Sequence, residues 1–209
     1  MLLTEMFESI QGEGPLIGVP MMFVRTNRCN LRCKWCDSTY TFQGGQEYML
    51  EYVLDKVSKS RSEWVCFTGG EPLLQRDAPE FVRGAVKAGR KVLIETGGSI
   101  SIADFVRIEN TVIDMDIKTP SSEEQESLDR KNLELLRSTD YVKFVISDDR
   151  DFDYAVDFLG NLGKDTQVVF QPAWGSSLKE LTERVLKNNL NVRVLPQLHK
   201  LIWGEIPGV

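Results

Sequence analysis

Residues 21–36 read MMFVRTNRCNLRCKWC, an apolar run that leads directly into a loop with three cysteines. The run Met21–Thr26 is rich in residues that favour a buried strand. The loop brings together Cys29, Cys33 and Cys36, and thiolates are soft ligands that suit iron–sulfur clusters and zinc. Three ligands leave one coordination position open, which distinguishes a reactive metal site from a closed structural one. The stretch therefore predicts a strand that carries a reactive metal site at its carboxyl end.

Further apolar and β-branched runs predict a series of strands, separated for the most part by amphipathic helical patterns. The expected strands are Met21–Thr26, Trp64–Thr68, Lys91–Glu95, Val112–Ile117, Tyr141–Ile146 and Gln167–Gln171. Apolar residues recur at helical spacing within 50–57, 78–85, 152–159 and 178–185. Strands that alternate with helices pair in parallel, and these strands are too few for a closed eight-stranded barrel. We therefore expect an α/β fold whose mostly parallel sheet forms a partial barrel.

Other features of the chain limit its organisation and its partners. The 209 residues contain no linker or repeat, so we expect one domain over 1–209. A net charge of −6 argues against a nucleic-acid partner. No apolar stretch is long enough for a membrane span, and the acidic N-terminus does not resemble a signal peptide. We expect a cytoplasmic protein with a small-molecule or protein partner, free thiols and no membrane contact.

Polar and glycine motifs follow the expected strands at their carboxyl ends. TGGEP (68–72) follows the second strand, ETGG (95–98) the third and DIK (116–118) the fourth. Because parallel strands end at the same edge of a sheet, these motifs and the cysteine loop should surround one site. The fourth cysteine, Cys66, is expected to be a small core residue. The charged stretch 121–136 fits either a loop or a solvated helix, and we favour the helix.

The spacing CxxxCxxC, followed by GGEP, resembles the signature of the radical S-adenosylmethionine (SAM) superfamily. The resemblance implies a partial (β/α)6 barrel of the radical SAM type and a [4Fe-4S] cluster on Cys29, Cys33 and Cys36, with SAM on the open iron. Asp116 and Lys118 depart from the Ser-Pro-Lys found in many members. The SAM contacts that it implies are Trp35, Cys36, Asp37, Gly70, Glu95, Asp116, Lys118 and Gln171.

The segment SIQGEG (9–14), with Arg25 before the cysteine loop and PQLHK (196–200) near the end, is similar to the 7-carboxy-7-deazaguanine synthase family. The resemblance implies a carbon–nitrogen lyase of queuosine and 7-deazapurine biosynthesis. Such an enzyme converts 6-carboxy-5,6,7,8-tetrahydropterin to 7-carboxy-7-deazaguanine with loss of ammonia, and it also uses Mg²⁺, here on Ser38. Amide, carboxylate and guanidinium groups suit the ring edge and carboxylate of a pterin. The implied substrate contacts are Ile10, Gln11, Gly12, Glu13, Arg25, Thr68 and His199.

The same resemblance implies a mechanism and partners. An electron from a donor such as a flavodoxin or a ferredoxin would cleave SAM and produce the radical that removes a hydrogen atom from the pterin. A homodimer is expected, with the C-terminal segment, about 196–209, closing near the active site. Two alternatives remain open: a radical SAM activating enzyme that installs a glycyl radical in a partner protein, and a non-catalytic iron–sulfur or zinc module.

Overall fold

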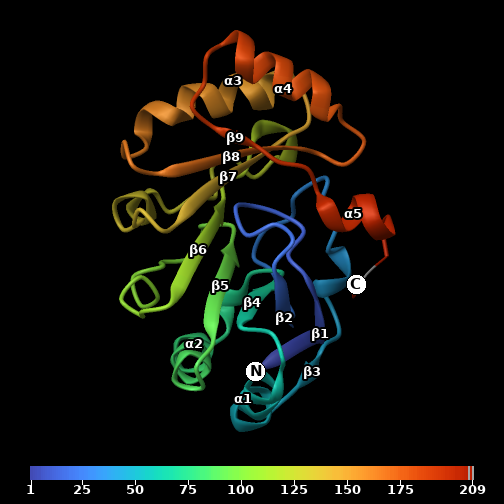
Figure 1. Ribbon diagram of the computed structural model, residues 1–209, viewed down its shortest axis with the longest axis vertical. Coiled ribbons are helices and arrows are strands. Elements are labelled where there is room, and N and C mark those ends of the chain that lie inside the picture. Colours follow the sequence, from blue (N-terminus) through green and yellow to red (C-terminus); the bar gives the residue numbers. More distant parts are fainter. Residues whose placement is uncertain (207, 209) are drawn as a thin grey trace.

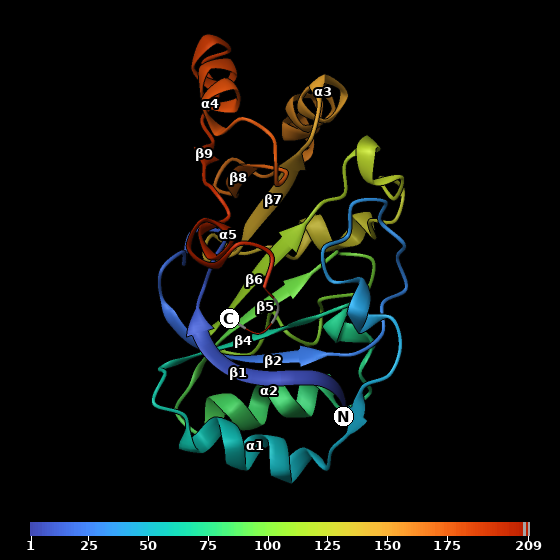
Figure 2. The same cartoon turned by 90° about the vertical axis from the view of Figure 1, so that its right-hand side faces the viewer.

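The computed structural model describes residues 1–206 and 208, and its strands form one sheet in the order β3-β1-β2-β4-β5-β6-β7-β8-β9 (Figure 1). The expected strands are confirmed, and in the part of the sheet that runs β2-β4-β5-β6-β7-β8-β9 each strand pairs in parallel with its neighbour. They are β2 (Pro20–Thr26), β4 (Trp64–Gly69), β5 (Lys91–Thr96), β6 (Thr111–Asp116), β7 (Tyr141–Ile146) and β8 (Gln167–Pro172), followed by the short β9 (Arg193–Val194). In Figure 2 the sheet fans open without closing on itself, so a partial barrel is confirmed.

Two strands at the start of the sheet were not expected from the sequence. β1 (Leu2–Ile10) pairs antiparallel with β2, and β3 (Gln46–Glu47) pairs antiparallel with β1. Most side chains of β1 are half-buried on both of its faces, so the strand lacks the clear alternation that marks a one-sided strand. β1 matters for the site because its last residue, Ile10, leads directly into the SIQGEG turn.

The four helical patterns are confirmed as α1 (Leu50–Lys59), α2 (Ala78–Lys87), α3 (Asp149–Phe158) and α4 (Leu178–Lys187). Asp148 and Ser177 cap α3 and α4, where their side chains accept hydrogen bonds from the amides of Asp151 and Glu180. A short helix, α5 (Leu198–Trp203), lies across the opening of the sheet in Figure 2. Within residues 1–206 and 208, no helix has the length and apolar character that a membrane crossing requires.

The helix favoured for 121–136 was wrong. The segment from β6 to β7 instead contains 3₁₀ turns at Pro120–Ser122 and Arg130–Glu134. The buried side chain of Asn132 donates to the carbonyls of Gly98 and Ile100 and accepts from the amide of Ile102. An asparagine that bonds to distant backbone in this way competes with helix formation, and it anchors the segment against the ETGG turn.

The two faces of the sheet differ in chemistry. The helices and the outward-facing strand residues form the larger apolar core. On the inner face, a smaller apolar cluster of Met21, Cys66, Leu93, Tyr141 and Val169 lies below the carboxyl ends of the strands. Cys66 is fully buried there, as expected of a core residue. Beyond that cluster the inner face turns polar, so the sheet positions its functional groups at one edge.

Candidate active site

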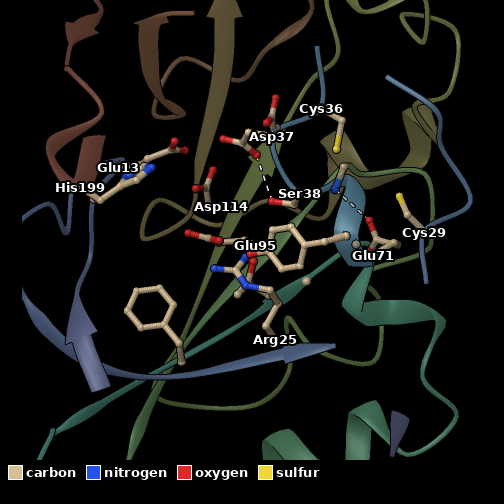
Figure 3. Close-up of a pocket in the computed structure, with 18 of the residues that line it drawn as sticks. Glu13, Arg25, Cys29, Cys36, Asp37, Ser38, Glu71, Glu95, Asp114 and His199 are labelled. Carbon is tan, nitrogen blue, oxygen red and sulfur yellow. Dashed lines mark hydrogen bonds between the residues drawn. The ribbon is translucent and has the colours of Figure 1, made fainter. Parts of the chain in front are cut away.

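One pocket opens at the carboxyl edge of the sheet (Figure 3). It is bounded by the N-terminal loop (residues 10–19), the cysteine loop (residues 29–38) and residues of α5. Most side chains expected to bind cofactors or substrate line it together. They are Ile10, Gln11, Gly12, Glu13, Arg25, Cys29, Cys33, Cys36, Asp37, Ser38, Thr68, Gly70, Glu95, Asp116, Lys118 and His199.

Two of the expected SAM contacts do not line this pocket. The indole nitrogen of Trp35 donates to Ser121 Oγ at 2.9 Å, and Trp35 lines a second pocket together with Ser121 and Ser147. Gln171 lies fully buried on β8, and neither its amide oxygen nor its amide nitrogen has a hydrogen-bond partner among the described residues. Roles for these two side chains remain predictions.

The cysteine loop holds three half-buried free thiols. One contact to a thiol is a hydrogen bond from the amide of Leu31 to Cys29 Sγ at 3.4 Å. Burial raises the pKa of Cys33 to about 11, so a metal centre must displace the thiol proton to bind there. The backbone of the loop is tied elsewhere, for example by the amide of Lys34 to the carbonyl of Ser122 at 3.0 Å.

The arrangement of the donors favours a cluster over a single zinc ion. In the described part of the chain, no three His, Cys, Asp or Glu side chains converge to hold one metal ion. The fourth cysteine, Cys66, is buried in the inner apolar cluster. A [4Fe-4S] cluster binds its thiolates at separate iron atoms, so three spaced thiols that line one pocket fit it.

The TGGEP turn packs against the start of the cysteine loop. A Cβ atom on Gly70 would lie 2.3 Å from the carbonyl oxygen of Arg28, so only glycine allows this approach. The amide of Glu71 donates to the same carbonyl at 2.9 Å. The buried carboxylate of Glu71 accepts hydrogen bonds from Thr96 Oγ1 and from the amide of Gly97, both at 2.9 Å. The turn therefore fixes the cysteine loop relative to β5.

The N-terminal loop is folded by its own polar groups. The amide of Gln11 donates to Val19 at 2.8 Å, and the amide of Gly18 donates to Gln11 at 2.7 Å. The Gln11 side chain donates to Glu95 Oε1 at 2.8 Å and accepts from the amide of Glu13 at 3.1 Å. The loop thus points its amide and carboxylate groups into the pocket in a fixed arrangement.

Glu13 belongs to a buried charge cluster that the sequence analysis did not anticipate. Lys143 Nζ lies 2.6 Å from Glu13 Oε2, 3.4 Å from Asp114 Oδ2 and 4.0 Å from Asp116 Oδ2. Asp116 also pairs with Lys118 at 3.0 Å. Burial opposes ionisation of Glu13, yet the charge of Lys143 and the hydrogen bonds from Gln197 and Lys143 act together against it, and the pKa of Glu13 lies below its usual range. The carboxylate is therefore ionised at neutral pH.

Arg25 is positioned as the expected carboxylate partner. Its Nε donates to Glu5 Oε1 at 2.7 Å, and its guanidinium lies 5.8 Å from the ring centre of Phe7. Tyr40 donates to the same Glu5 oxygen at 3.1 Å. These contacts use Nε and leave the outer guanidinium nitrogens for a ligand, which suits paired hydrogen bonds to a carboxylate.

The C-terminal segment connects the two loops. The amide of Leu198 donates to Gly12 at 2.8 Å, and Gln197 Nε2 donates to Glu13 Oε1 at 2.8 Å. The ring of His199 covers Gly12 so closely that a Cβ atom there would lie 2.0 Å from His199 Nδ1. On the other side, Lys200 Nζ lies 3.0 Å from Asp37 Oδ2 in the cysteine loop. Pro207 and Val209 of the expected C-terminal closure lie outside the described residues.

Ser38 has the chemistry of a cation ligand. Its hydroxyl donates to Asp37 Oδ1 at 3.0 Å, which leaves the lone pairs of Oγ available to a metal. Lys200 holds the other oxygen of the same carboxylate. A hydroxyl oriented by a neighbouring carboxylate fits Mg²⁺, which prefers oxygen ligands and few of them from protein.

The fold and the site define a class of protein. A partial parallel barrel with three cysteines after its first parallel strand is the architecture of the radical SAM superfamily, whose family model matches residues 23–147. Members of this superfamily use a [4Fe-4S] cluster and SAM, and the chain is such an enzyme. Within that class, the chain belongs to the 7-carboxy-7-deazaguanine synthase family.

Curated relatives establish the family. The 7-carboxy-7-deazaguanine synthase of Thermoplasma acidophilum is 53% identical over 209 residues, which cover 100% of both chains. That of Koribacter versatilis is 39% identical over 228 residues, again with 100% of both chains covered. The crystal structure of QueE from Escherichia coli matches with a TM-score of 0.80 at 22% identity and covers 95% of this chain and 94% of that one. At that identity the structural match supports the fold.

Proposed function

We propose that this enzyme converts 6-carboxy-5,6,7,8-tetrahydropterin to 7-carboxy-7-deazaguanine with loss of ammonia, as a step in queuosine or other 7-deazapurine biosynthesis. One observation carries the proposal: the cysteines and the polar groups of the SIQGEG loop line the same pocket. A cluster alone would fit many radical SAM reactions. A cluster next to a preformed set of amide, carboxylate and guanidinium groups fits a pterin carboxylate.

Each group in the pocket has a task in this proposal. Cys29, Cys33 and Cys36 hold the cluster, which together with SAM supplies the one-electron chemistry that removes a hydrogen atom from the substrate. Glu13, already ionised, accepts hydrogen bonds from ring N–H groups of the pterin. Arg25 pairs with the pterin carboxylate through its outer guanidinium nitrogens.

Other pocket residues complete the proposed contacts. The substrate is bordered by Ile10, Gln11, Gly12, Thr68 and His199. SAM is bordered by Asp37, Gly70, Glu95, Asp116 and Lys118. The backbone of Cys36 also borders SAM. Holding the two reactants together in one enclosed geometry is the main contribution of the protein to such a reaction.

The proposed magnesium ligand is Ser38, supported by its hydrogen bond to Asp37. Mg²⁺ there would neutralise the substrate carboxylate and orient it next to Arg25. An electron donor such as a flavodoxin or a ferredoxin, a homodimeric assembly and a cytoplasmic location complete the proposal.

Anaerobic reconstitution tests the proposal. Protein loaded with iron and sulfide is incubated with SAM, a reductant, Mg²⁺ and the carboxytetrahydropterin, and the products are identified by mass. We expect 7-carboxy-7-deazaguanine and one ammonia for each turnover. SAM cleavage without the deazaguanine would overturn the proposal and favour an activating enzyme, and colourless protein that retains stoichiometric zinc would favour a binding module.

A further inference from the structure

The inner face of the sheet carries a row of four polar side chains at the level of the pocket, and three of them already have proposed ligands. Arg25 on β2 pairs in register with Thr68 on β4, and Glu95 on β5 pairs in register with Asp114 on β6. The parallel register of β4 and β5 joins the two pairs into one row. All four side chains line the pocket. Asp114 therefore lies at the same depth as the residues that border the substrate and SAM.

Asp114 has weaker hydrogen bonds than Glu13 or Asp116. The side chain is fully buried, and its Oδ1 atom has no hydrogen-bond partner among the described residues. Within the described part of the chain, its Oδ2 atom accepts only a long contact from Lys143 Nζ, at 3.4 Å. Asp116 Oδ1 also lacks a partner among the described residues, but Asp116 Oδ2 accepts from Lys118 Nζ at 3.0 Å. Glu13, by comparison, has a close partner on each oxygen. An unpartnered carboxylate oxygen is costly to bury in ionised form, whereas a carboxylic acid in a pocket can donate to a ligand.

The groups around Asp114 keep a proton on it. Lys143 of β7 is the facing cation, and Glu13, Glu95 and Asp116 face it from the N-terminal loop, β5 and β6. Burial raises the pKa of Asp114 to about 7. Lys143 lowers this pKa, and the neighbouring carboxylates raise it and so offset part of the effect of Lys143. Lys143 itself is bound to Glu13, and its pKa is raised well above the ordinary value despite its burial. Lys143 therefore holds its proton too tightly to exchange it near neutral pH.

We propose that Asp114 is a catalytic residue that carries the proton needed for the loss of ammonia. This inference rests on the proposed function. As the C–N bond breaks, its electron pair stays with nitrogen, and the acid proton on Oδ1 completes ammonia. The carboxylate then takes a proton from the ring carbon, whose C–H electron pair becomes a ring double bond. The acid is restored, and the step needs no oxidant or reductant.

The test separates hydrogen abstraction from ammonia loss in the reconstituted enzyme. The substrate carries deuterium at C6, and D114N is compared with wild type and with Y141F. Tyr141 Oη is another buried group without a hydrogen-bond partner among the described residues, and Tyr141 pairs in register with Asp114, but it is not one of the residues that line the pocket. We expect D114N to transfer deuterium to the adenosyl group within about threefold of wild type while deazaguanine formation falls at least about 100-fold. Y141F should retain product formation.

Two further readouts accompany the rates. In D114N a species with the mass of the substrate and a different retention time should accumulate, because the rearranged ring regains the abstracted hydrogen and still contains the nitrogen that leaves as ammonia. The rate of product formation by wild type should fall as the pH rises above about 7, and the pH–rate profile of D114N should lack this fall. D114E keeps a carboxylic acid at this position. It should retain product formation, and its rate should fall at a shifted pH.

Defined results overturn the assignment. D114N with product formation near wild type, or with deuterium transfer lost together with product, contradicts it. If D114N does not fold, the pH–rate profile of D114E is the test. A fall in rate at a shifted pH supports the assignment, and a profile without such a fall overturns it. A wild-type enzyme that transfers deuterium but makes no deazaguanine overturns the proposed function instead, and the two failures are therefore distinguishable.

Discussion

The N-terminal loop and the cysteine loop enter the pocket from opposite sides in Figure 3, and they are held in different ways. In the N-terminal loop the functional atoms themselves are bonded, since Glu13 contacts Lys143 at 2.6 Å and Gln197 at 2.8 Å. In the cysteine loop the backbone is bonded, while the thiols have few hydrogen-bond partners in the part of the chain that the structure describes, such as the 3.4 Å contact from the Leu31 amide to Cys29 Sγ. The first loop is preorganised by protein alone. The second loop provides thiol ligands, and these gain their bonding partner when the cluster binds.

The comparison predicts the largest effect for the cysteine loop. In C33A, iron content and product formation should fall to background, because two thiolates do not hold the cluster with its open iron in place. The melting temperature of the cluster-free protein should change little, since the Cys33 thiol has no hydrogen-bond partner among residues 1–206 and 208. Iron analysis, visible absorbance and thermal melting measure the three quantities. A large drop in melting temperature would show that the thiols also support the fold.

For the N-terminal loop we expect the reverse: breaking its contacts should lower the stability of the folded protein. In K143M the carboxylates of Glu13, Asp114 and Asp116 lose their shared cation, and breaking such a buried pair costs about 3–5 kcal/mol. The matched control is K34M in the cysteine loop, whose pair with Glu123 is exposed and worth at most about 1 kcal/mol. Urea unfolding of both variants gives the free energies. Equal losses of unfolding free energy in K143M and K34M would contradict the proposed difference between the two loops.

A smaller effect concerns pH. The pKa of Asp114 is about 7 in the folded protein and about 3.9 when unfolded. Between these values the folded state binds more protons, so this group stabilises the fold most below about pH 4 and loses that contribution as the pH rises to 7. D114N should flatten the decline of unfolding free energy with pH by at most about 1.4 kcal/mol per pH unit. An unchanged slope in D114N would contradict the assignment of the proton.

The same two loops show what could be predicted from the sequence. The cysteine loop and the strand before it form a local pattern, and their ligands lie within a few residues of one another. The partners of Glu13 do not: Lys143 is 130 residues away, and their contact depends on how β7 packs beside the N-terminal loop. A lysine within the apolar run YVKFVI was a signal of a buried ion pair, but it did not identify the partner.

Other differences have equally specific causes. The family resemblance placed Trp35 among the SAM contacts, yet its indole nitrogen donates to Ser121, and its ring centre lies 5.5 Å from Lys118 Nζ. The carboxylates of Asp114 and Asp116, two residues apart on a buried strand, share the inner face, and the sequence analysis used only the second. Lys200 follows the expected His199, and its pair with Asp37 depends on where α5 comes to rest.

The most direct test of this division between the loops compares E13Q with C33A under anaerobic reconstitution, with SAM cleavage and deazaguanine formation measured in the same samples. E13Q weakens charge-assisted hydrogen bonds to the substrate, worth about 1.5–3 kcal/mol, so product formation should fall about 10–100-fold at subsaturating pterin. Its reductive cleavage of SAM without substrate should stay within about threefold of wild type, whereas C33A should lose both activities. If E13Q lost SAM cleavage to the same extent as C33A, or formed product at the wild-type rate, the N-terminal loop would not be the element that binds the substrate.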